Sequence, residues 1–320
     1  MQKPLAQIFN EMAAAAHKVF PEELENLVVF LLSSSDPVIY AAPEIAKHLA
    51  NNPAAVKKAV EQATNYMSSR HIDGIAERDY PLAGDFVSRI ALYENPDGIC
   101  FSRYTEEMRA ISRINHEIGH LVVENGYAYV PASKHLADCA ADAYAALRHI
   151  QQFGKETDYF EYYSFAHAAV FGNSTSHYTD DVIQRVKQLS EETDISRLSL
   201  RETAELAGKI ALEYSLNEKT LKKISTAFSP VADAYKKAGG LDDTVLRKCI
   251  EVMREHKDDP DIFKAGARFL NYPSYKEGLE NKAKTDPYWR NALDFIKNHQ
   301  TKPVKKTLHP RSTDSVMKGR

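Results

Sequence analysis

Residues 106–125 constrain the fold most strongly, because their apolar side chains repeat with the period of an α-helix. At about 100° per residue, one stripe holds Ile111, Ile114, Ile118, Leu121 and Val122. His116 and His120 fall on nearly the opposite side, with Glu117 between the two stripes. Gly126 is a suitable C-terminal stop. We therefore expect a helix that packs its apolar stripe into a core while its histidines face a cleft or solvent.

Helical patterns also dominate the rest of the chain. They cover residues 21–32 and 42–67 near the N-terminus, and 201–216 and 241–256 further on. Alternation is confined to residues 85–93, which the turn sequence Asn-Pro-Asp-Gly separates from residues 99–104. The sequence therefore predicts an α+β protein that is mostly helical, with a small sheet or hairpin just upstream of the histidines.

The length of 320 residues and the apolar fraction of 43% allow one or two domains. We expect an N-terminal helical region at 1–75, a core carrying the histidines at 76–190 and a C-terminal helical region at 191–300. Residues 301–320 are rich in basic groups and poor in apolar ones, which predicts a disordered basic tail.

The overall charge and the cysteines narrow the class of protein. The net charge of −3 gives no field that would recruit nucleic acid. The three cysteines, Cys100, Cys139 and Cys249, are an odd and sparse set, which a reducing compartment tolerates. No Cys-x-x-Cys pair suggests a zinc site made of thiolates. The longest apolar run, at 27–32, is too short to cross a bilayer. The N-terminus shows no Sec signal, so we expect a cytoplasmic protein; secretion as an effector by a non-Sec route stays compatible with the sequence.

The four-residue spacing of the two histidines has a chemical interpretation. Residues four apart on a helix lie one above the other, so His116 and His120 can bind one Zn²⁺ at about 2.0–2.1 Å. Glu117 can then reach a water whose pKa the zinc lowers toward about 7. The alternative is a chance His-Glu-x-x-His on a surface helix.

A second helix, predicted at 133–154, supplies candidate third ligands. Ser133 is a plausible N-cap and Gly154 a stop. Opposite its apolar stripe lie His135, Asp138, Asp142, Ala145 and His149. An ordinary solvated polar face is the alternative to a ligand set.

These two segments together resemble the zincin metallopeptidases, specifically the gluzincin-like group, over residues 85–150. Asp-Cys-Ala-Ala-Asp-Ala-Tyr-Ala-Ala at 138–146 is similar to the Glu-x-x-Ala-Asp pattern of that group. The resemblance implies a zincin-like catalytic core with Asp138 as the third zinc ligand in place of glutamate. It also implies that Asp142 orients a zinc-binding histidine. Asp142 and His135 remain alternative ligands, and His135 and His149 are further candidates for the shell around the ligands.

The resemblance also implies how substrate would bind. An edge strand of a zincin pairs with an extended peptide, and residues 86–93 or 99–104 are the candidates here. His177 and Tyr178, in the polar loop 172–181, are candidate donors to the oxyanion. A hairpin that only covers the core and a plain surface loop are the respective alternatives.

The expected function is a zinc-dependent metallopeptidase that acts on peptide or protein substrates, with Glu117 as general base. Two alternatives stay open. One is an inactive or non-peptidase zincin-like hydrolase. The other is a helical interaction or effector protein with a vestigial motif. The sequence sets no oligomeric state and predicts neither nucleic acid nor membrane as a partner.

Overall fold

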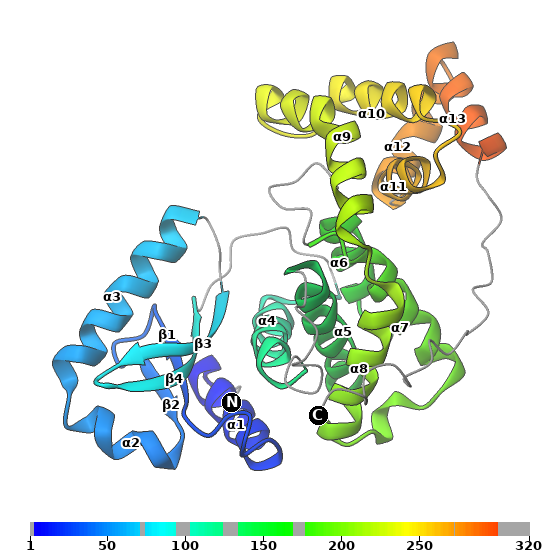
Figure 1. Ribbon diagram of the computed structural model, residues 1–320. Coiled ribbons are helices and arrows are strands. Elements are labelled where there is room, and N and C mark those ends of the chain that lie inside the picture. The colour runs from blue at the N-terminus through cyan, green and yellow to red at the C-terminus, as the bar shows by residue number, and fades with distance from the viewer. Residues whose placement is uncertain are drawn as a thin grey trace, which may run out of the picture. The chain divides into compact units, whose positions relative to one another are not determined.

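The computed structural model describes residues 3–70, 74–93, 103–123, 134–168, 177–271 and 273–299. Helices predominate, and a small four-stranded mixed sheet completes the structure, which confirms the α+β, mostly helical class. The chain divides into two compact units, Met1–Ala232 and Asp233–Arg320 (Figure 1). Among the described helices, none is both long enough and apolar enough to cross a membrane.

The sheet belongs to the first unit and has the strand order β2-β1-β4-β3. Its strands are β1 (Leu27–Leu31), β2 (Val38–Ala41), β3 (Gly74–Leu82) and β4 (Asp85–Leu92). β1 and β4 are parallel, and the outer strands β2 and β3 are antiparallel to their neighbours. Ala83 and Gly84, both with positive φ, join β3 to β4 in the tight turn that suits the twist of a hairpin. β3 is therefore an edge strand.

The helices of the first unit surround this sheet and continue beyond it. They are α1 (Leu5–Val19), α2 (Pro43–Ala50), α3 (Pro53–Arg70), α4 (Glu106–Val122), α5 (Lys134–Phe153), α6 (Tyr159–Ala168), α7 (Asp180–Glu192) and α8 (Leu200–Tyr214), with a short 3₁₀ helix at Ile195–Arg197. α9 (Glu218–Ala238) crosses the boundary between the units.

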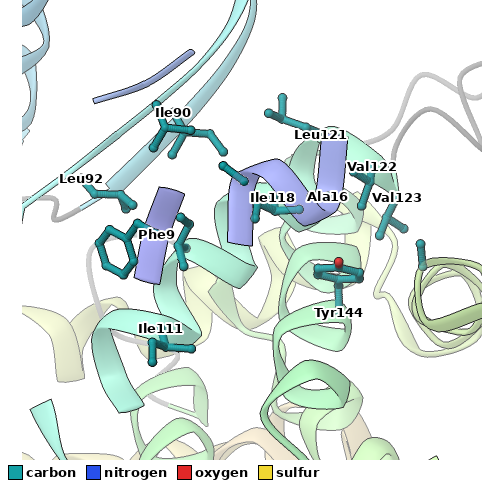
Figure 2. Close-up of a cluster of buried hydrophobic side chains, with 14 of the residues drawn as sticks. Phe9, Ala16, Ile90, Leu92, Ile111, Ile118, Leu121, Val122, Val123 and Tyr144 are labelled. Atoms are coloured by element: carbon teal, nitrogen blue, oxygen red, sulfur yellow. The ribbon is translucent and has the colours of Figure 1, made fainter. Parts of the chain in front are cut away.

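The apolar stripe of α4 packs into the core of this unit. Figure 2 shows Ile118 of α4 close to side chains of α1 and β4, among them Ile90. Successive residues of a strand point to opposite faces, and Arg89 accordingly donates to the backbone oxygen of Ala59 in α3. α1 and α4 therefore cover one face of the sheet and α3 covers the other.

α4 and α5 approach each other closely, and this contact depends on Gly119. A Cβ placed on Gly119 would lie 2.9 Å from Cα of Ala141 and 3.2 Å from Cβ of Tyr144. Contacts this short with backbone atoms cannot be relieved by a side-chain rotation. The absence of a side chain at Gly119 therefore sets the separation of α4 and α5.

Most of the predicted helices are confirmed. The two histidine-region segments form α4 and α5, and α5 ends before Gly154, whose φ of 78° suits a helix stop. Residues 42–67 form α2 and α3, and the C-terminal patterns form α8 and α10 (Asp243–Glu255). Ser133, Gly126, Cys100 and the basic tail 301–320 lie outside the described residues.

Two predictions about the strands are wrong. Residues 21–32 were expected to be helical, but Leu27–Leu31 forms β1, and β2 follows, so residues 1–75 are not uniformly helical. β1 is buried along its whole length, which gives a continuous apolar run instead of an alternating one. Residues 86–93 cannot be the expected edge strand, because β4 pairs with β1 on one side and β3 on the other.

The second unit is helical. Beyond the end of α9 it holds α10, α11 (Pro260–Leu270), α12 (Pro273–Ala283) and α13 (Pro287–His299). Trp289 is the single tryptophan of the chain and is buried in this unit. The guanidinium of Arg247 lies 4.7 Å from its ring centroid.

Substituting Gly119→Ala should lower the free energy of unfolding by about 1–3 kcal/mol, because the added methyl forces α4 away from α5. Gly278→Ala in α12 is the matched control, since a Cβ there meets no atom within 4 Å. That change should leave stability unaltered or raise it by up to about 1 kcal/mol, the helix preference of alanine over glycine. Urea unfolding followed by circular dichroism measures both. Equal stabilities of the two variants would contradict the assigned role of Gly119.

Candidate functional site

Both ends of α4 are fixed by side chains, which holds the histidines in place. At the N-terminus, the hydroxyl of Thr105 accepts a hydrogen bond from the backbone N–H of Met108 at 3.2 Å. At the other end, Arg78 of β3 donates to the backbone oxygens of His120 and Leu121. These oxygens have no partner within the helix, so Arg78 both caps α4 and ties it to the edge strand.

His116, His120 and Asp138 form a compact group in which each offers one ligand atom, all within 4.8 Å of one another. The two Nε2 atoms of His116 and His120 are 3.1 Å apart. Nε2 of His120 lies 3.6 Å from Oδ1 of Asp138. Of the three sequence candidates for a third ligand, Asp138 is the one that the structure brings to both histidines in this way.

The geometry of this group fits a divalent cation. Two atoms at about 2.0–2.1 Å from a tetrahedral zinc lie about 3.3 Å apart, close to both separations above. The side chain of Asp138 is only 4% exposed, and its Oδ2 accepts no hydrogen bond from the described residues. A buried carboxylate oxygen is costly without a partner. His116, His120 and Asp138 are therefore the residues that could hold a metal ion.

Asp142 links the first histidine to a third helix. Its Oδ1 lies 2.7 Å from Nδ1 of His116, and its Oδ2 accepts a hydrogen bond from the hydroxyl of Thr179 at 2.5 Å. Thr179 precedes α7, yet its side chain makes no cap hydrogen bond to that helix. Its hydroxyl instead orients Asp142. With Nδ1 held by Asp142, Nε2 of His116 is left to face His120 and Asp138.

Negative charge concentrates around His116. Burial opposes its protonation, but the carboxylates of Asp142, Glu117 and Asp138 outweigh burial and raise the pKa of His116 to about 9. Burial also raises the pKa of Glu117, although His116, His120 and Arg113 lower it. An environment that favours added positive charge at His116 is the environment that a cation site requires.

Glu117 lies between α4 and the edge strand. A Cβ placed on Gly74, the first residue of β3, would be only 2.6 Å from Oε1 of Glu117 and 3.3 Å from Cδ of Arg113. A side chain at position 74 would therefore displace the carboxylate. Gly74 was not singled out from the sequence, because the contact joins residues more than forty positions apart in the chain.

His135 and His149, also named from the sequence, make other contacts. Nε2 of His135 accepts the backbone N–H of Leu216 at 3.0 Å. His149 has Nδ1 at 3.2 Å from the hydroxyl of Ser112 and Nε2 at 2.6 Å from that of Thr157. Burial lowers the pKa of His149 to about 3, so this ring is neutral and serves packing. Both histidines belong to the interior of the helix bundle, not to the group around His116.

His177, one of the two candidate donors before α7, contacts the group around His116. His177 is half-exposed, with Nδ1 at 3.5 Å from Oδ2 of Asp138. Tyr178 is buried. Residues 172–176 of the predicted loop lie outside the described residues. His177 is thus the candidate that stands at the edge of the group.

In comparisons with known proteins, no family model, curated protein or solved structure matches the chain.

If His116, His120 and Asp138 hold a zinc ion, removing the hydroxyl of Thr179 should weaken its binding, because Asp142 would lose the hydrogen bond from Thr179 that orients it. We expect Thr179→Val, which keeps the size of the side chain, to raise the dissociation constant for Zn²⁺ by roughly 10–100-fold. Thr179→Ser retains the hydroxyl and should bind nearly as tightly as the unmodified protein. Competition with a chromophoric chelator gives the constants. Equal affinities for the valine and serine variants would remove Thr179 from the site.

Proposed function

We propose that this protein is a zinc-dependent metallopeptidase of the zincin type, similar to the gluzincin-like group. One observation carries the proposal: Nε2 of His116, Nε2 of His120 and the carboxylate of Asp138 converge, with Glu117 buried beside them. The fixed Nδ1 of His116 and the unbonded Oδ2 of Asp138 support it further. The resemblance in sequence and the arrangement in space rest on the same residues.

In this proposal His116, His120 and Asp138 hold one Zn²⁺, with Asp138 in place of the usual glutamate. When bound, the ion would supply positive charge that acidifies a water molecule and polarises the scissile carbonyl. Glu117 would take the proton from the attacking water and deliver it to the leaving amine. Asp142 and Thr179 would keep the ring of His116 in the orientation that exposes Nε2.

Substrate would bind along β3, not β4. β3 is one of the two edge strands of the sheet, and its first residue lies against Glu117. An extended peptide that adds to this edge would pass next to the proposed base. His177 is our candidate for the oxyanion donor, because it is half-exposed at the edge of the group while Tyr178 is buried. The cytoplasmic location expected from the sequence stays a prediction.

Replacing Glu117 with glutamine tests the proposed chemistry. Glu117→Gln keeps the size of the side chain but cannot accept the proton, so cleavage should fall at least ~100-fold, while zinc content stays at that of the unmodified protein. Glu106→Gln, at the exposed start of the same helix, is the matched control and should retain activity. Mass spectrometry of a mixed peptide library measures cleavage, and elemental analysis measures zinc.

Two results would contradict the proposal in different ways. Undiminished cleavage by the Glu117→Gln variant would refute the role of Glu117. Zinc-loaded protein that cleaves no peptide in the library would refute the peptidase and leave an inactive or non-peptidase zincin-like protein.

A further inference from the structure

A cavity lies on the other side of the histidine helix α4. It has a volume of about 280 Å³ and is formed by α1, α4, α5 and the first residue of α8, all in the first unit. Asn115 and Ile118 line it from α4. On a helix these two positions lie roughly 150° around the axis from the side that carries His116 and His120. The cavity is therefore separate from the proposed metal site.

Two hydrogen-bond donors of α5 line this cavity without an acidic partner. Arg148 is partly buried, burial lowers the pKa of its guanidinium, and its hydrogen bond in the described structure goes to the neutral amide oxygen of Gln151. Tyr144, one turn earlier, is buried and lines the same cavity. A partly buried cation without a counter-charge favours an anionic partner. An anionic oxygen in the cavity would find a donor in both Arg148 and Tyr144.

The remaining walls are mainly apolar. Ile8 and Met12 of α1 line the cavity together with Ile118 of α4. The acidic residue at this cavity, Glu11, is exposed and its carboxylate is bound by Lys3 at 2.8 Å. It therefore does not serve as the counter-charge of Arg148. The pocket offers one cationic end and one apolar wall, a pairing that suits a ligand with a single anionic group and a hydrocarbon part.

We propose that this cavity binds a small aliphatic carboxylate, whose carboxylate group is held by Arg148 and Tyr144 and whose chain packs on Ile8, Met12 and Ile118. The volume lies just below the roughly 300–1,000 Å³ typical of ligand sites, which favours a short chain. The site does not depend on the proposed peptidase activity, because none of these residues belongs to the metal group.

Octanoate is a suitable probe, because it joins one carboxylate to a flexible aliphatic chain. Isothermal titration calorimetry of the full chain should give one site. Octylammonium, which has the same chain and the opposite charge, should bind at least ~10-fold more weakly, as loss of a charged hydrogen bond predicts. This comparison uses the unmodified protein and so does not depend on the folding of any variant. The proposal would be overturned if octanoate did not bind, or if octanoate and octylammonium bound equally tightly.

Three variants locate the binding. Arg148→Met should weaken octanoate at least ~10-fold, whereas Arg185→Met should not, since Arg185 of α7 is paired with Glu192 and lies outside the cavity lining. A carboxylate can also bind zinc, so the titration is repeated with His116→Ala, in which affinity for octanoate should be unchanged. Loss of binding in His116→Ala, or its retention in Arg148→Met, would place the ligand elsewhere and refute this site.

Discussion

The close approach of α4 and α5 at Gly119 is the constraint on which the rest of the site depends. Gly119 stands between the two histidines in the sequence, one residue before His120, and faces the backbone of Ala141. Ala141 in turn lies between Asp138 and Asp142 along α5. The contact thus brings a helix with two imidazoles against a helix with two carboxylates, at the level where the four side chains meet. A larger residue at position 119 would move these imidazoles away from the carboxylates.

The polar stripe of α5 is an internal feature of the fold. Its aspartates and histidines were compatible with a solvated helix face, yet His135, Asp138, Asp142 and His149 are all buried. Burial of this many polar groups is tolerated only when each is hydrogen-bonded or paired with opposite charge. His135, Asp142 and His149 are hydrogen-bonded as described above. Asp138 differs in that its Oδ2 accepts no hydrogen bond from the described residues, and its carboxylate instead faces the imidazoles of His120 and His177.

How much of the structure the sequence could predict depends on how far apart along the chain the interacting residues lie. The helices and the placement of His116 one turn before His120 are set within a few residues, so periodicity and spacing were sufficient to predict them. β1 was missed because a strand buried on both faces has no alternation to detect. Thr179 lies 37 positions from Asp142, and the contact of Gly74 with Glu117 also joins distant segments. No local pattern encodes these pairs, nor the cavity shared by α1, α4 and α5.

The central claim is that two imidazoles of α4 and one carboxylate of α5 share a single zinc ion. Anomalous diffraction at the zinc absorption edge, from crystals of the zinc-loaded protein, tests it most directly. We predict one strong peak in the first unit, at about 2.0–2.2 Å from Nε2 of His116, Nε2 of His120 and an oxygen of Asp138. A map without a peak there, or a zinc ion held by other residues, would contradict the account.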